Sequence, residues 1–111
     1  MALIVICDEP AGLLRQIRRG ILDGQIVTWS FDDDGDFTHA TPQWRNQAWM
    51  RPRPGYDRLV FTILSPQNVQ LTREVYAIYH GRLTEMLLAH FDNLFRSAAA
   101  TALPTPDDRV Q

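Results

Sequence analysis

The stretch LTREVYAIYHGRLTEMLLAHFDNLFRSAAA, residues 71–100, decides the fold, because it is the segment that is both long and periodic enough to predict a helix by itself. On a helical wheel its large apolar side chains fall in one wide arc, and most of its charged side chains fall opposite. A stripe of this width is typical of a helix that packs on a sheet, and a coiled coil would show a narrower one.

The two ends of this predicted helix are marked unequally. Thr72 is a suitable N-cap, and Glu74 places an acid in the first turn, where the helix dipole favours negative charge. At the other end Ser97–Ala100 can extend the helix, and Pro104 stops it. We therefore expect one helix that runs into the alanine-rich end of the stretch, followed by a flexible C-terminal tail at residues 101–111.

Length and charge restrict the class of protein. The chain has 111 residues, a formal net charge of −2 and one cysteine, Cys7. This length predicts a single domain, which we place at residues 1–100. One cysteine excludes an internal disulfide and is typical of a reducing cytoplasm. No apolar run approaches the length of a transmembrane helix, so we expect a cytoplasmic protein with no membrane partner.

The first part of the chain predicts a strand or an extended lead-in, followed by a helix. Residues 2–7 are apolar but too few for periodicity to decide between the two alternatives. Pro10 is suited to the first helical position, and Gly24 to the left-handed position that ends the helix. Three arginines, at positions 15, 18 and 19, are expected on the solvent side of this helix.

Residues 25–41 predict a β-hairpin, and its register can be argued. A three-residue loop that ends in a left-handed Gly35 pairs Phe31 with Phe37 and Trp29 with His39. A two-residue turn would instead divide these large side chains between the two faces. We prefer the first register because it gathers them on one face.

That register sets Asp32 opposite Asp36. Like charges in this position repel, so either both carboxylates are well solvated or a cation lies between them, which could be an arginine or a metal ion. Asp32 and Asp36 are therefore candidate metal ligands. His39 would complete a hydrolase site, but it lies on the other face. A calcium loop of the EF-hand kind would need a closing acid, where Thr41 stands. A solubilising hairpin turn is the simpler interpretation.

The middle of the chain predicts two more strands. Residues 46–51 form the first, and a turn at Pro52, Pro54 and Gly55 follows. Residues 57–64 are β-branched and aromatic, with apolar side chains on both faces, which favours a central place in the sheet.

Aromatic and arginine side chains alternate around these two strands. Such mixtures are typical of binding hot spots. A strand pair whose aromatic side chains are buried in the core has the same sequence pattern. The candidate partner-binding residues are Trp44, Arg45, Trp49, Arg51, Arg53 and Tyr56.

These elements together predict an α+β protein. We expect a two-layer sandwich in which an N-terminal helix and a long C-terminal helix pack on one face of an antiparallel sheet of three to four strands. The other sheet face would stay partly open.

The chain contains no familiar nucleophile, phosphate-binding or zinc-binding motif, which favours a non-enzymatic protein. The first hypothesis is a small bacterial protein-interaction module, either similar in role to an immunity protein or antitoxin, or self-associating as a homodimer. The alternative is a small hydrolase or nuclease that uses a divalent cation at the Asp32/Asp36 hairpin, which would be its cofactor. A third hypothesis, a nucleic-acid-binding domain, is disfavoured by the negative net charge.

Overall fold

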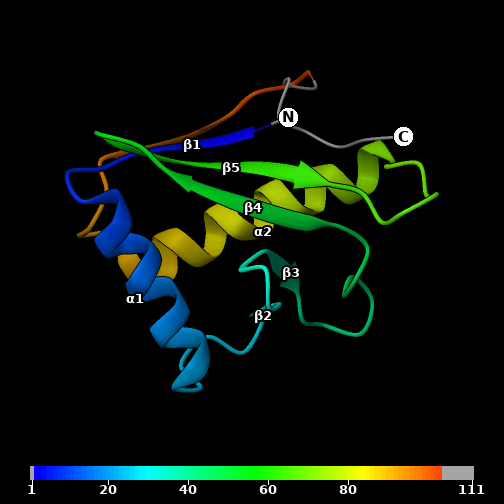
Figure 1. The fold of residues 1–111 in the computed structure, drawn as a ribbon, viewed down its shortest axis with the longest axis horizontal. Helices are drawn as coiled ribbons and strands as arrows, with labels where there is room; N and C mark the ends of the chain where they lie inside the picture. The colour runs from blue at the N-terminus through cyan, green and yellow to red at the C-terminus, as the bar shows by residue number, and fades with distance from the viewer. Residues whose placement is uncertain (1, 104–111) are drawn as a thin grey trace.

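The computed structural model describes residues 2–103, which form an α+β fold with one antiparallel six-stranded sheet and two helices (Figure 1). The strand order is β2-β3-β4-β5-β1-β6. The α+β class agrees with the prediction, but the expected three to four strands were too few. The elements are β1 (Ala2–Ile6), α1 (Pro10–Leu22), β2 (Trp29–Phe31), β3 (Phe37–His39), β4 (Trp49–Pro54), β5 (Arg58–Leu64), α2 (Arg73–Phe91) and β6 (Ser97–Ala100).

The long helix is shorter than the sequence predicted. It begins with the expected cap, since the Thr72 side chain accepts a hydrogen bond from the Val75 N–H at 3.2 Å. It ends at Phe91, and Ser97–Ala100 form strand β6, so the expected helical extension was wrong. Alanine has the highest helix propensity, but here the backbone of the alanine run is hydrogen-bonded by the edge of β1.

Strand β1 is the second strand beyond the expected three to four. Residues 2–7, for which the sequence left two alternatives, form a strand between β5 and β6. Its Leu3 and Val5 side chains are buried and face the helices. Strand β5 holds the central position that its composition predicted, and its Phe61 lies opposite Leu3 in the core.

Strand β4 extends through two prolines that the sequence placed in a turn. It covers Trp49–Pro54 and pairs with β5 along its whole length, so the predicted strand at 46–51 was placed too early. The Gly55 N–H donates to the Arg58 carbonyl at 2.8 Å, which means that odd-numbered N–H groups of β4 point toward β5. Positions 52 and 54 point away, where proline removes no ladder hydrogen bond.

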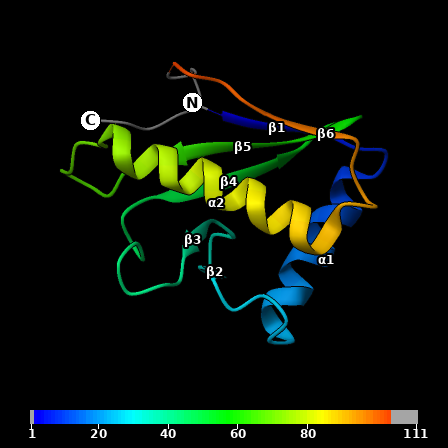
Figure 2. The same ribbon diagram turned by 180° about the vertical axis from the view of Figure 1, so that it is seen from behind.

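Both helices contribute to one core. Figure 2 shows α2 crossing one face of the sheet. Tyr79 and Leu83 of α2 and Leu13 and Ile17 of α1 belong to the same buried cluster as the helix-facing side chains of β5. Gly24 has a φ of 79°, as its predicted role after α1 requires. Within residues 2–103, neither helix is long and apolar enough to cross a membrane.

The hairpin register is confirmed. Trp29 lies opposite His39, Phe31 lies opposite Phe37, and Gly35 has a φ of 83°. At the C-terminal end, the predicted tail begins with Thr101, whose N–H donates to the Ala2 carbonyl at 2.8 Å. Residues 104–111 of that tail lie outside the described residues.

Candidate functional site

The acidic turn is held by its own backbone. The Asp32 N–H donates to the Asp36 carbonyl at 3.0 Å. The Oδ1 atom of Asp32 accepts hydrogen bonds from the N–H groups of Asp34 and Asp36, both at 3.0 Å. One carboxylate oxygen of Asp32 is therefore already used in shaping the turn.

Arg51 supplies the cation that the facing aspartates were expected to need. Its Nε lies 3.0 Å from Asp36 Oδ1, and its Nη2 lies 2.8 Å from Asp36 Oδ2. These hydrogen bonds raise the pKa of Arg51 above its ordinary value, although burial opposes the shift. Arg51 is therefore ionised over the whole range in which proteins are folded, and a bidentate pair neutralises the buried Asp36 carboxylate.

The predicted metal site is only partly assembled. Ligand atoms of Asp32, Asp34 and Asp36 lie within 4.8 Å of one another, so three carboxylates could approach one cation. Both oxygens of Asp36, however, are bound by Arg51. His39 does not join them, because its Nδ1 is hydrogen-bonded to Thr41 Oγ1 at 2.8 Å and its ring packs among aromatic side chains.

The acidic turn and the start of β4 share one groove, which the sequence did not indicate. Its volume is about 310 Å³, and it brings a predicted metal-binding segment beside two predicted partner-binding side chains. The groove is lined by Asp32, Asp34, Asp36, Trp49, Arg51, Leu64, Pro66 and Gln67.

Only half of the predicted partner-binding residues share a face. Trp49, Arg51 and Arg53 alternate along β4 and therefore lie on the sheet face opposite the core residue Met50. Trp44 instead packs against the core, and its carbonyl accepts a hydrogen bond from the Tyr79 hydroxyl.

The remaining two predicted residues are exposed at other places. Arg45 lies in the loop before β4. Tyr56 is 97% exposed in the turn between β4 and β5, so it can reach a partner only at the end of the sheet.

The sheet face opposite the core carries lateral rows of side chains, and three of these rows reach β1. In the middle row, Arg53 lies beside Val60, Val60 beside Ile4, and Ile4 beside Ala99. The other two rows follow the same register: Arg51, Thr62 and Ala2, and then Arg58, Ile6 and Ser97. We call these three rows the open face, because no helix of residues 2–103 lies over them in Figure 1.

The open face has an apolar centre that the sequence analysis did not assign. Ile4, Ile6 and Val60 are each half-buried, whereas Leu3 and Val5 on the opposite face are fully buried. The available signal was the apolar composition of both faces in residues 2–7 and 57–64.

The arginine cluster of α1 is not a continuous solvent face. Arg18 turns toward the hairpin, where its guanidinium lies 6.0 Å from the Phe31 ring centre and 5.9 Å from that of Phe37. Its Nη2 also donates to the Gly35 carbonyl at 3.4 Å. The predicted solvent position of Arg18 was therefore wrong, and this weakens the case for a nucleic-acid surface.

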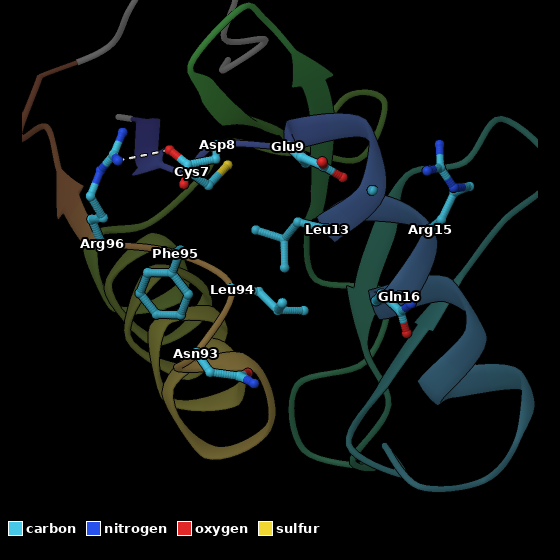
Figure 3. Close-up of a pocket in the computed structure, with 11 residues that line it drawn as sticks. Cys7, Asp8, Glu9, Leu13, Arg15, Gln16, Asn93, Leu94, Phe95 and Arg96 are labelled. Atoms are coloured by element: carbon cyan, nitrogen blue, oxygen red, sulfur yellow. Dashed lines mark ion pairs between the residues drawn. The ribbon is translucent and has the colours of Figure 1, made fainter.

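A second cavity of about 430 Å³ lies between the start of α1 and the segment that follows α2 (Figure 3). Cys7, Leu13 and Phe95 are among its lining residues, and an ion pair of 2.7 Å joins Arg96 to Asp8 beside it. Burial raises the pKa of the Cys7 thiol, which keeps it protonated and a poor nucleophile. No histidine is among the residues that line this cavity, so a thiol–base pair does not form there.

No protein-family model, curated protein or solved structure matches this chain.

Proposed function

We propose that this chain is a non-enzymatic protein-interaction module that binds a second copy of itself through the open face. The support is the half-exposed apolar centre formed by Ile4, Ile6 and Val60 on a sheet face that no helix of the described chain covers. A contiguous apolar patch with a polar border is the usual mark of a protein–protein contact.

The charges around the apolar centre favour a second copy as the occupant. The acidic turn lies beside the Trp49 end of β4, and Arg53 and Arg58 lie toward the other end of the β4–β5 pair. A two-fold axis that lies in the plane of the contact, at right angles to the line from the acidic end to the arginine end, would set the acidic end of one copy against the arginine end of the other. Such an isologous contact uses the same patch twice and is electrostatically complementary in both places.

A different protein could occupy the same face. A role similar to that of an immunity protein or antitoxin would need a partner with an apolar centre and acidic side chains opposite the arginines. The self-complementary arrangement of charge supports the homodimer first, because a single chain then supplies both halves of the contact.

Light scattering at increasing concentration tests the homodimer. We expect the mass to rise from one protomer toward two between about 1 μM and about 300 μM, the usual range of a modest interface. Val60→Glu should remain monomeric, because it buries a charge at the centre of the contact. Leu22→Glu is the control, since Leu22 is 76% exposed at the end of α1. A wild-type chain that stays monomeric throughout overturns the homodimer.

A second candidate function, divalent-cation binding at the acidic turn, is favoured by the three carboxylates within 4.8 Å. A cation there could activate water for hydrolysis, but it would have to displace Arg51 from Asp36. If this function is correct, millimolar Mg²⁺, Mn²⁺ or Ca²⁺ raises the melting temperature and Asp32→Asn removes the rise. Asp33→Asn, outside the carboxylate cluster, is the control. Equal melting temperatures with and without the cations end this candidate.

A further inference from the structure

Strand β6 ends the sheet with backbone groups that point outward. Ile4 pairs with Ala99 and Ile6 pairs with Ser97, and the Thr101 N–H donates to Ala2 in the same register. In an antiparallel ladder the alternate residues point the other way, so the N–H and C=O groups of Ala98 and Ala100 face away from β1.

The exposed edges of β4 and β6 differ in whether their outward backbone N–H groups are available for pairing. Pro52 and Pro54 remove the outward N–H groups of β4, and proline at an edge prevents another strand from pairing there. Strand β6 carries only Ser97–Ala100, without a proline or a charged side chain. Within residues 2–103 no strand pairs with its outward backbone groups, which are therefore able to pair with an additional strand.

A groove lies between β6 and α2, on the helix side of the sheet. Ala100 is on that side because it pairs with the core residue Leu3. The groove has a volume of about 470 Å³, within the range of pockets that hold side chains and small ligands. It is lined by Tyr76, Ala77, His80, Gly81, Thr84, Ala100, Thr101 and Ala102.

From this edge and this groove we propose a second binding site, which takes an extended segment of a partner protein as a seventh strand beside β6. The outward groups of Ala98 and Ala100 would bind its main chain. Every second side chain of an added strand points to the helix side, where the groove would receive it.

The groove indicates the chemistry of those side chains. No charged residue is among those that line it, and the nearby Arg82 and Glu85 neutralise each other at 3.3 Å. At Gly81 an added Cβ would meet no atom within 4 Å, so the helix leaves space there. The segment should therefore carry uncharged, apolar side chains at alternate positions.

A second copy of β6 fits this site less well than a foreign segment. Its alanine side chains would leave most of the groove unfilled, and a pairing of four residues is small against the roughly 800 Å² per partner of a stable interface. The site lies on the helix side of the sheet and does not use the open face. The proposed peptide site can therefore be tested independently of the proposed homodimer.

Selection from a phage-displayed library of random extended peptides, with the full chain as bait, tests this site. We expect enriched peptides with apolar side chains at alternate positions, and fluorescence anisotropy with one synthetic peptide then gives its affinity. Ala98→Pro should weaken binding at least about tenfold, since it removes an outward donor as Pro52 does on β4. N-methylation of alternate peptide nitrogens should have the same effect.

Two variants of α2 distinguish the effect of filling the groove from the effect of placing a leucine elsewhere on the same helix. Gly81→Leu fills the groove and should also weaken the peptide at least about tenfold, while Ala89→Leu, on an exposed position outside the groove, should not. Melting curves show which variants are folded, and the N-methylated peptide keeps the test valid if Ala98→Pro does not fold.

Failure to enrich such peptides would overturn the proposal. So would enriched peptides whose affinity is changed neither by Gly81→Leu nor by N-methylation. So would loss of self-association in Ala98→Pro without peptide binding, which would assign the edge to a second copy.

Discussion

Arg51 and Asp36 form a bidentate ion pair that joins the hairpin to the main sheet, with N–O distances of 3.0 and 2.8 Å. The Asp36 side chain is 5% exposed and that of Arg51 is 47% exposed. Among the described residues β3 pairs with β4 only at Phe37 and Met50, so the ion pair is a second connection between the same two parts of the chain.

Removal of Arg51 should destabilise the fold. Arg51→Ala leaves the buried Asp36 carboxylate without its partner, and we expect a loss of about 1–3 kcal/mol in the free energy of unfolding. The expected loss is at the lower end of the range for buried pairs because water reaches half of Arg51. Urea denaturation measures it, with the exposed Arg45→Ala as control. If the two variants are equally stable, the ion pair does not support the hairpin.

The Tyr79 hydroxyl connects α2 to the loop before β4. It donates to the Trp44 carbonyl, accepts from the Gln47 N–H at 3.3 Å and lies 3.1 Å from Thr38 Oγ1. Tyr79→Phe should cost about 1–3 kcal/mol, because it leaves buried polar groups unpaired while the ring remains packed.

Hydrogen exchange locates this effect. Amides of residues 41–48 should exchange faster in Tyr79→Phe, because the loop loses its attachment to α2. Tyr76→Phe is the matched control, since Tyr76 is a half-buried tyrosine one turn earlier in the same helix. Uniformly faster exchange, without a local increase at 41–48, would contradict the proposed attachment.

His39 should make stability depend on pH. Burial, and after it the charge of Arg82, lowers the pKa of His39 from its ordinary value of 6.5. The unfolded chain therefore binds the proton more readily than the folded chain. The contribution is fully present above pH 6.5 and is lost as the pH falls from 6.5 toward the lowered pKa.

Urea denaturation between pH 7.5 and pH 5 measures this dependence. We expect His39→Gln to be less stable at pH 7.5, because it disturbs the packing against Trp29, but to lose less stability on acidification. An equally steep pH dependence in both proteins would mean that other groups are responsible. The exposed His90→Gln is the matched histidine control.

Parts of the fold follow from local sequence. The hairpin register was predictable because Gly35 fixes the loop and only one register gathers Trp29, Phe31 and Phe37. The end of α2 was not predictable, because the three alanines of Ser97–Ala100 are good helix formers that become a strand only where the edge of β1 is available. Strand β4 was misplaced for a similar reason. A proline in a strand is acceptable only if its N–H position faces away from the neighbouring strand, which a single sequence does not show.

The candidate site, like the fold, has some features that follow from local sequence and others that depend on contacts between distant segments. The facing of Asp32 and Asp36 followed from the turn, and the need for a cation followed from their charge. That Arg51 would supply it depended on the contact between β3 and β4. The sequence did not show that Trp44 and Trp49 lie on different parts of the surface, because this depends on the Trp44 loop folding back onto Tyr79. The apolar centre of the open face required knowing that β1 and β5 are neighbours.

Exchange of charge between the two ends of the open face tests the central claim most directly. One variant carries Arg53→Glu and Arg58→Glu, and the other carries Asp33→Lys and Asp34→Lys. In the two-fold arrangement each variant meets like charge in its own homodimer, whereas a mixture of the two meets opposite charge at both contacts.

Sedimentation velocity on each variant and on their equimolar mixture gives the answer. We predict that each variant alone sediments as a monomer and that the mixture sediments as a dimer, as the wild type should. Variants that dimerise alone as well as the wild type does, or a mixture that stays monomeric, would contradict self-association through the open face.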